Sequence, residues 1–224
     1  MKNFKIIIVA FFCIPFISIK AQITESRIKY ALLGGVNFQN WNGTDVNGSM
    51  MDNKLITGYH LGGNVQIPLA PEFYFQPGFL FSTKGTKINT DSVNNKYKIS
   101  YLELPLNFVY KGLLGRGFVM VGFGPYLGYG IKGKVTFTRN GSDVVSDVKF
   151  KNTIETSDPS NTPYLKSFDA GANIFAGYEL ESGLFFQLNT QLGALKLNPE
   201  NKRISNDKTS LKNTGYGFSV GFRF

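Results

Sequence analysis

The chain ends with a strictly alternating stretch, Gly215-Tyr216-Gly217-Phe218-Ser219-Val220-Gly221-Phe222-Arg223-Phe224. Every second residue is aromatic or Val, and the residues between them are Gly, Ser or Arg. Successive side chains of a β-strand point to opposite faces, so a period of two indicates a strand rather than a helix. The stretch therefore predicts a strand with one apolar face and one small or polar face.

The same alternation recurs in seven earlier stretches. They cover residues 29–39, 55–67, 73–84, 101–110, 119–132, 168–180 and 184–193. Most are long enough to cross a bilayer when tilted, which takes about 9–11 residues. Their polar face is rich in Gly, Asn, Gln and Ser rather than in Lys and Glu. Such a face suits the crowded interior of a narrow closed barrel, whereas the Phe, Tyr and Leu face suits lipid.

The connections between these stretches alternate in length. Long polar connections cover residues 40–54, 85–96, 133–166 and 196–211, and short ones cover residues 70–72, 112–117 and 181–183. A barrel with both chain ends in the periplasm has short periplasmic turns and long external loops in this order. We therefore predict an all-β fold: a closed, up-and-down, antiparallel transmembrane β-barrel of about eight strands. Closure is required because an open edge would leave backbone groups unpaired in the bilayer.

The amino terminus has the order of a secretory signal peptide. Two lysines precede an apolar run over residues 6–19, and Ala21 supplies a small residue before a polar one. The run is shorter than the roughly 20 residues of a spanning helix, which an uncleaved membrane anchor, the alternative, would need. We expect cleavage after Ala21, which gives a signal peptide at residues 1–21 and one barrel domain at residues 22–224.

The composition excludes several classes of protein. The 224 residues include one Cys, Cys13, and one His, His60. One thiol cannot form an internal disulfide, and neither a Cys-based nor a His-rich metal site can be built. Loss of residues 1–21 removes the Cys and three lysines, which lowers the formal charge from +9 to +6 (21 basic and 15 acidic residues). We expect no catalytic, cofactor-binding or metal-binding residues, and no nucleic-acid partner for an exported barrel.

Several charged residues fall on the predicted interior face. They are Glu103, Asp169, Glu179, Lys29, Lys132 and Arg223. We expect Lys132 and Asp169 near the outer rim, and Lys29, Glu179 and Arg223 near the periplasmic rim. Buried charges must be paired, so we expect ion pairs that fill a lumen too narrow for free passage. A constricted channel lined by these charges is the alternative.

His60 lies on the same interior face. We interpret it as a hydrogen-bonded interior residue. A Ser–His–Asp nucleophile system with His60 as the base is the alternative, which we set aside because we expect no nucleophile motif of the Gly-x-Ser-x-Gly type.

The long loops carry many basic residues, which we expect to be solvated or to meet lipid headgroups and lipopolysaccharide phosphates. These residues are Lys54, Lys84, Lys87, Lys96, Lys149, Lys151, Lys202, Arg203, Lys208 and Lys212. The longest loop, residues 133–166, contains Val135–Thr138 and Val144–Phe150, which could extend the barrel as a hairpin above the membrane. We expect a ligand or partner site, if the chain has one, in this extension.

Two motifs resemble a known family. The stretch Tyr101-Leu102-Glu103-Leu104-Pro105-Leu106, followed by Gly122-Phe123-Gly124-Pro125-Tyr126-Leu127-Gly128-Tyr129, resembles the PorT-like outer-membrane β-barrel family of Bacteroidota. Phe168-Asp169-Ala170-Gly171 and Gly177-Tyr178-Glu179 are similar to its later strands. The resemblance implies residence in the outer membrane of a Gram-negative cell. It does not imply one activity, although the namesake takes part in protein secretion.

These observations lead to a function class rather than to a reaction. We predict an integral outer-membrane barrel with a structural or surface-binding role and no catalysis. The final strand, which ends at Phe224, is expected to be read by the outer-membrane assembly machinery through β-augmentation. An envelope protein partner is left open. The alternatives are a narrow pore, a secretion-associated barrel, and an exported soluble carrier like a lipocalin, whose apolar residues would lie inside and whose polar residues would lie outside.

Overall fold

The computed structural model describes residues 27–90, 93–139 and 142–224 of the chain. The signal peptide that we expect at residues 1–21 lies outside the described residues. Within the described ranges, no helix is long and apolar enough to cross a membrane.

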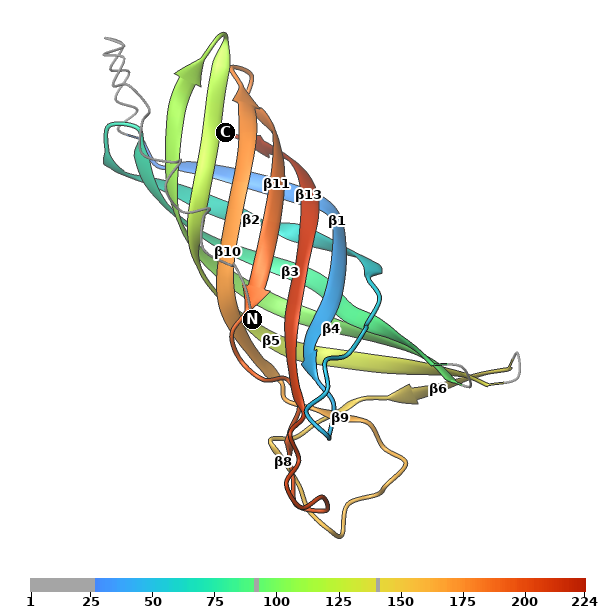
Figure 1. Cartoon of the computed structure of the whole chain (residues 1–224). Coiled ribbons are helices and arrows are strands. Elements are labelled where there is room, and N and C mark those ends of the chain that lie inside the picture. Colours follow the sequence, from blue (N-terminus) through green and yellow to red (C-terminus); the bar gives the residue numbers. More distant parts are fainter. Residues whose placement is uncertain (1–26, 91–92, 140–141) are drawn as a thin grey trace, which may run out of the picture.

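Eight long strands of the described chain form a closed ring (Figure 1). They are β1 (Lys29–Thr44), β2 (Ile56–Ala70), β3 (Phe73–Thr90), β4 (Val93–Leu114), β5 (Gly117–Arg139), β10 (Phe168–Leu180), β11 (Leu184–Gly193) and β13 (Ser210–Arg223). Each pairs antiparallel with the next, and β13 pairs with β1 to close the ring. The predicted up-and-down transmembrane barrel is confirmed.

The turns at one end of the barrel are short, as the sequence predicts. Two residues separate β2 from β3 and β4 from β5, and three separate β10 from β11. Gly115 and Gly183 have φ angles of 63° and 91° in the last two of these turns. A side chain at such an angle is strained, which explains why glycine occupies both positions.

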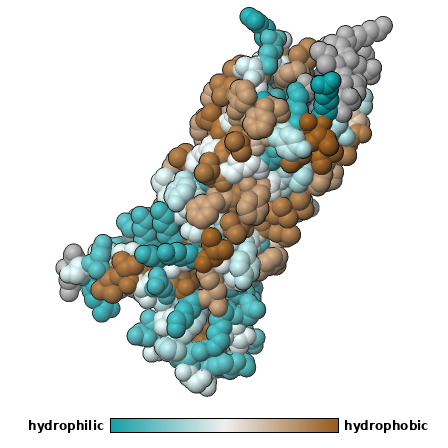
Figure 2. Space-filling view, turned by 180° about the vertical axis from the view of Figure 1, so that it is seen from behind, coloured by the Kyte–Doolittle hydropathy of each residue, from teal (hydrophilic) through white to brown (hydrophobic). Residues whose placement is uncertain are grey.

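The two faces of the wall differ as the alternation predicts. Figure 2 shows hydrophobic side chains over the shaft of the barrel and hydrophilic ones over its loop end. Every long strand presents exposed apolar side chains, among them Leu32, Leu61, Phe79, Leu104, Phe123, Ile174, Leu188 and Phe218. Their neighbours in sequence are buried or half-buried inside, or are glycines. The exposed apolar side chains therefore form the lipid-facing belt, and the polar side chains fill the lumen together with a buried apolar cluster that includes Val109, Met120 and Phe175.

The strands run beyond the membrane belt at the loop end. Residues 85–96 were predicted as a loop, and that prediction is wrong for the described residues, because β3 extends to Thr90 and β4 begins at Val93, with pairs such as Lys87↔Lys96. Outside the bilayer, water can solvate the polar side chains of a strand, so the apolar alternation stops before the strand does. The predicted hairpin is confirmed, since β5 pairs with β6 (Ser142–Asp147) through Val135↔Ser146 and Phe137↔Val144.

A bulge in β5 changes which side chains point inward. Ser100 pairs with Lys132 and Tyr101 pairs with Gly130, so Ile131 is an extra residue in β5. Ile131 and Lys132 are both exposed, and the alternation resumes with the opposite parity. The prediction that Lys132 faces the interior is therefore wrong.

Four very short strands tie two of the loops together. β7 (Lys149–Phe150) pairs in parallel with β9 (Tyr164–Leu165), and β8 (Thr153–Ile154) pairs in parallel with β12 (Glu200–Asn201). Residues 148–166 and 196–209 thus fold into one unit over the outer mouth of the barrel, which we call the cap (Figure 1).

Candidate functional site

The barrel interior is built in layers that follow the inward positions of the strands. From the periplasmic end, β4 contributes Lys111, Val109, Asn107, Glu103 and Tyr101, all buried. The other strands add matching side chains at each level, so charged, apolar and polar layers alternate. The side chains in these layers determine whether a ligand or a solute can enter the lumen.

The layer at the periplasmic end is an ion-pair cluster of Lys111, Glu179 and Arg223, which we call the inner cluster. Lys111 Nζ lies 2.8 Å from Glu179 Oε1, and Arg223 Nε donates to Glu179 Oε2 at 2.9 Å. The Arg223 guanidinium also donates to Asn64 Oδ1 at 3.1 Å and to Gln76 Oε1 at 3.3 Å. This cluster holds two cations and one anion, all nearly inaccessible to solvent.

A second cluster lies nearer the outer mouth and contains Lys84, Glu103 and Asp169; we call it the outer cluster. Lys84 Nζ lies 2.8 Å from Glu103 Oε1 and 3.4 Å from Asp169 Oδ2. Asp169 Oδ2 also accepts from Tyr126 Oη at 3.1 Å and from Asn213 Nδ2 at 2.8 Å. Its three charged side chains are at most 1% exposed. The outer cluster thus has one cation and two anions, whereas the inner cluster has two cations and one anion.

The predicted interior charges are partly confirmed. Glu103, Asp169, Glu179 and Arg223 are buried and paired, and Lys29 lies half-buried in the first strand. Lys132 is replaced as the outer-rim cation by Lys84, which we had also placed among the loop lysines.

Lys111 was missed altogether. Its position in sequence gave the signal, because continuing the alternation of Glu103 and Asn107 by two more steps places Lys111 on the inward face.

His60 takes part in a serine–histidine–asparagine arrangement. Its Nε2 lies 2.8 Å from Ser219 Oγ, and its Nδ1 lies 2.7 Å from Asn37 Oδ1. Our expectation that the chain has no nucleophile motif is wrong, because Gly217-Phe218-Ser219-Val220-Gly221 matches Gly-x-Ser-x-Gly. The motif nevertheless lies inside β13, which is paired on both sides at Ser219, rather than at a strand-to-helix turn.

The space around this arrangement is small. A cavity of about 40 Å³ adjoins Ser219, which is 1% exposed, and His60. Such a volume holds about two or three water-sized groups. Backbone N–H groups committed to two strand ladders are not free to form an oxyanion hole. Asn37, His60 and Ser219 therefore form a hydrogen-bond network inside the barrel. This agrees with our interpretation of His60 as a hydrogen-bonded interior residue. No group of three or more His, Asp or Glu side chains in the described ranges could hold a metal ion.

The outer mouth is closed by apolar side chains. Trp41, Ile99 and Tyr101 from the strands pack with Val148, Leu165 and Leu197 from the cap, and each is at most 6% exposed. The cap is thus held on the barrel by a small hydrophobic core of its own.

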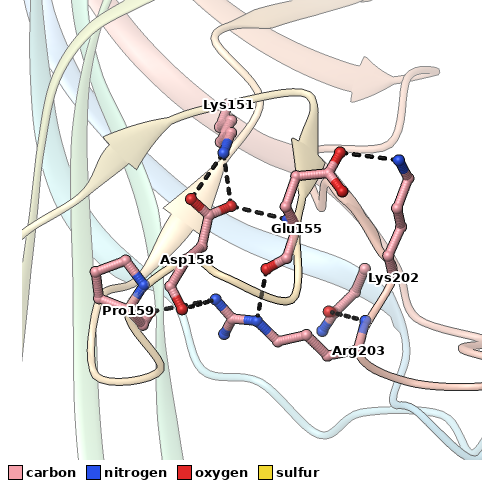
Figure 3. Close-up of polar contacts among 7 residues, drawn as sticks. Lys151, Glu155, Asp158, Pro159, Lys202 and Arg203 are labelled. Atoms are coloured by element: carbon pink, nitrogen blue, oxygen red, sulfur yellow. Dashed lines mark hydrogen bonds and ion pairs between the residues drawn. The ribbon is translucent and has the colours of Figure 1, made fainter.

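Ion pairs and hydrogen bonds stabilise the cap, and those of Lys202 and Arg203 join its two segments (Figure 3). Lys151 Nζ donates to both Asp158 carboxylate oxygens, at 2.8 and 2.6 Å, and Lys202 Nζ lies 2.9 Å from Glu155 Oε1. The Arg203 guanidinium donates to the backbone carbonyls of Glu155 and Asp158. The hydrogen bond from Lys151 holds the pKa of Asp158 below its usual range, with a further contribution from the Glu155 amide. The bond to Glu155 raises the pKa of Lys202.

A polar pocket of about 370 Å³ opens beside the cap. Its lining includes the cations of Lys166 and Lys196, the carboxylates of Glu200 and Asp207, and the amides of Asn198 and Asn201. The two lysine side chains form no ion pair with another described residue. Each also lies within two residues of an exposed apolar side chain, Phe168 or Leu195. The two lysines therefore lie at the outer edge of the lipid-facing belt, in a pocket that also contains two carboxylates.

Loss of the outer-cluster cation should strongly destabilise the barrel. Lys84→Met leaves two buried carboxylates without their cation, so we expect the free energy of unfolding to fall by about 3–5 kcal/mol. Urea unfolding in lipid vesicles measures this change. Arg116→Met is the matched control, because the Arg116–Glu181 pair spans 3.9 Å between exposed side chains. Equal unfolding midpoints for the two variants would contradict the assignment.

The cap should loosen in acid. Because the folded-state pKa of Asp158 is depressed, its contribution to stability is present above the ordinary pKa of about 3.9 and is lost as the pH falls through the lower folded value. Trp41, the single Trp, is 1% exposed beneath the cap and reports the change by a red shift of its emission. We expect Asp158→Asn to show this shift at neutral pH.

Asp52→Asn is the control for that experiment, since Asp52 is exposed. We expect the Trp41 emission of this variant to match that of the wild type. An acid transition identical in wild type and Asp158→Asn would argue against a role for this carboxylate.

A family match supports the fold assignment. The sequence pattern of the family described as "Outer membrane protein beta-barrel domain" matches residues 20–197. No curated protein matches the chain in sequence. Similar solved structures include OprG from Pseudomonas aeruginosa, with 12% identity, a TM-score of 0.49, and coverage of 88% of this chain and 95% of that one.

Two further structures show the range of proteins with a similar shape. The attachment invasion locus protein Ail of Yersinia pestis has 11% identity, a TM-score of 0.38, and coverage of 87% and 98% of the two chains. The outer membrane protease OmpT from Escherichia coli has 11% identity, a TM-score of 0.35, and coverage of 90% and 97%. We draw no functional argument from these structures. The family match covers most of the chain, and the protein therefore belongs to the outer membrane protein β-barrel domain family.

Proposed function

We propose that this protein is a closed, non-catalytic outer-membrane barrel whose cap binds the phosphate groups of lipopolysaccharide at the cell surface. The observation that carries the proposal is the pocket at Lys166 and Lys196, whose two ammonium groups have no ion-pair partner among the described residues at the edge of the lipid-facing belt. Glu200 and Asp207 line the same pocket without pairing with either lysine, so the proposal rests on the position of the two ammonium groups and not on a net positive charge. Lipid phosphates lie at this depth, and each lysine near such a surface contributes about 1 kcal/mol of attraction.

The rigidity of the cap supports a binding role. The Lys151–Asp158 pair stabilises one loop, and the Lys202–Glu155 pair and the apolar side chains below it hold the two loops together. A pre-formed surface loses less conformational entropy when it binds than a flexible loop does. Asn198 strengthens the pocket further, since its side chain bonds the backbone at Thr209 and Leu211.

The filled lumen favours a surface role over transport. Both ion-pair clusters and the apolar layer beneath the cap occupy the path that a solute would take. A soluble carrier would place its apolar face inside, whereas here that face is exposed on every long strand. We therefore keep the pore and the lipocalin-like carrier as alternatives that no observation favours.

The route to the membrane forms part of the proposal. We propose export by the signal peptide at residues 1–21, followed by recognition of the final strand, which ends at Phe224, by the assembly machinery. The motif Tyr101–Leu106 supports a PorT-like protein of a Gram-negative bacterium of the Bacteroidota. Participation in secretion has no support from the site itself.

A charge-matched pair of variants tests the binding role. We expect Lys166→Gln with Lys196→Gln to weaken binding of lipopolysaccharide to the refolded protein by about tenfold or more, since two attractive charges are lost. Lys96→Gln with Lys208→Gln removes the same charge from exposed positions outside the pocket. Titration of each protein with native and with dephosphorylated lipopolysaccharide measures the difference. Equal affinity of the two double variants for native lipopolysaccharide would overturn the proposal.

A further inference from the structure

Three lysines gather on the outward face of β4 and β5, just beyond the lipid-facing belt. Lys98 of β4 is opposite Lys134 of β5, and Lys132 lies two residues before Lys134 on the same face. All three are exposed, whereas Ile99 and Gly133, which follow Lys98 and Lys132 in sequence, are buried. Because opposite residues of an antiparallel pair share a face, the three ammonium groups project from one side of the sheet. We call Lys98, Lys132 and Lys134 the belt-edge lysines.

The bulge at Ile131 brings two of these lysines to the outward face. Had the alternation of β5 continued unbroken, Lys132 and Lys134 would point into the lumen, as Gly128 and Gly130 do. The extra residue leaves Ile131 in the belt, 46% exposed, and turns the two lysines to the side that faces the membrane and its surface. Bulges of this kind re-aim side chains and are over-represented next to functional sites. A local irregularity of β5 thus assembles the belt-edge lysines.

Aromatic side chains fix the depth of the belt-edge lysines relative to the bilayer. Tyr129 of β5 and Tyr59 of β2 are 57% and 51% exposed at the outer end of the belt. Aromatic residues form girdles at the two membrane interfaces of a transmembrane barrel. The Nζ atom of Lys98 lies 5.7 Å from the centroid of the Tyr59 ring, so this ammonium group leans toward the girdle rather than away from the membrane. The belt-edge lysines therefore lie at the depth of the lipid headgroups.

Few carboxylates surround the belt-edge lysines. None of the three forms an ion pair with a described residue. Among their register partners in the described strands, Asp147 of β6 is the one acidic residue; it is exposed and lies opposite Lys134. Like charges directly opposite each other destabilise a sheet, so Lys98 and Lys134 repel each other unless an anion lies between them. Three ammonium groups against one carboxylate leave an excess of positive charge.

A second row of lysines lies further from the belt and provides an internal comparison. Lys54 is paired in register with Lys87 of β3, which is opposite Lys96 of β4. Lys96 lies two residues beyond Lys98, which corresponds to about 7 Å along the strand. This outer row also forms no ion pair with a described residue. The two rows thus carry the same number of lysines at different distances from the belt, which separates an effect of depth from an effect of charge alone.

We propose that the belt-edge lysines bind a phosphate group of lipid A, the membrane-embedded part of lipopolysaccharide. The phosphate oxygens accept hydrogen bonds from Lys98 and Lys134, and Lys132 adds attraction from the membrane side. The acyl chains of the lipid lie along the apolar belt below. A phosphate in this position removes the repulsion between Lys98 and Lys134. The site lies on β4 and β5, is separate from the pocket beside the cap, and does not depend on that pocket.

Acetylation of lysines in nanodiscs tests the site. The wild-type protein is treated with a water-soluble acetylating ester in nanodiscs of phosphatidylcholine alone, or of phosphatidylcholine with diphosphoryl lipid A, and mass spectrometry gives the rate at each lysine. We expect lipid A to slow acetylation of the belt-edge lysines by about fivefold, which corresponds to the attraction of one lysine to an anionic surface. Lys54, Lys87 and Lys96 should react at unchanged rates. Equal slowing of both rows, or of neither, would overturn the proposal.

Two further conditions identify the source of the phosphate. Dephosphorylated lipid A in the same nanodiscs should leave the acetylation rates unchanged, because the anionic group is gone. Inorganic phosphate added to phosphatidylcholine nanodiscs should also leave them unchanged, because no acyl chain holds that ion at the depth of the belt edge. Protection by dephosphorylated lipid A, or protection by inorganic phosphate to the same extent as by lipid A, would contradict a site for lipid phosphate.

Matched variants measure how much the site contributes to affinity. They are made in the Lys166→Gln, Lys196→Gln protein, so that the pocket beside the cap does not contribute. We expect the further change of all three belt-edge lysines to Gln to weaken binding of lipid A in nanodiscs by about tenfold or more, since three attractive charges are lost. The control changes Lys54, Lys87 and Lys96 to Gln and should leave the affinity unchanged. Equal weakening by the two triple changes would be an effect of charge alone and would overturn the proposal.

The same background separates this site from the proposed function. The Lys166→Gln, Lys196→Gln protein should keep the protection of the belt-edge lysines by lipid A, because the pocket is not part of this site. Protection that disappears in that protein would contradict an independent site on β4 and β5. Failure of the pocket and failure of the belt-edge site are therefore observed separately.

Discussion

Hydrocarbon offers no hydrogen bonds to a polypeptide backbone, and the rest of this structure depends on that constraint. A strand can cross the bilayer only if both of its edges are paired, so the sheet must close on itself. The pairing of β13 with β1, from Ala31↔Arg223 to Thr44↔Ser210, achieves the closure. Once the ring is closed, the period of two along each strand assigns every side chain to lipid or to lumen.

The lumen of an eight-stranded ring is narrow, and its contents follow from that width. Glycines make room for large neighbours, since a methyl group at Gly122 would lie 2.3 Å from the Phe175 ring. Charges buried in this space are tolerated only in pairs, which accounts for Lys84 between Glu103 and Asp169. The interior therefore stabilises the barrel, and the exposed surface of the cap is left for binding.

Much of the fold could be predicted from sequence because alternation is a local property. The eight strands, their faces, the short turns and the hairpin of β5 with β6 all follow from residues near one another in the chain. Lys132 could not be placed, because a single extra residue at Ile131 reverses the parity and leaves no mark in the pattern. The partners of Lys84 and Lys111 lie on distant strands, and pairing between them depends on the register of the whole ring.

The cap was beyond prediction for a similar reason. Its contacts, such as Lys202 with Glu155, join segments 47 residues apart whose own sequences have no periodicity. The Gly217–Gly221 motif shows the opposite error, since a recognisable pattern was overlooked and its chemistry depends on surroundings that only the structure supplies. Local patterns thus determined the architecture, whereas the candidate site required long-range contacts.

The central claim is that the Phe, Tyr and Leu face of each strand is in contact with lipid. Spin labels placed singly at Phe79, Leu104 and Phe218 of the vesicle-embedded protein test it most directly. The account predicts that dissolved oxygen relaxes all three labels while a water-soluble nickel complex does not reach them. Labels that collide freely with the nickel complex would contradict it, and so would double-labelled proteins whose spins couple closely in a dry centre.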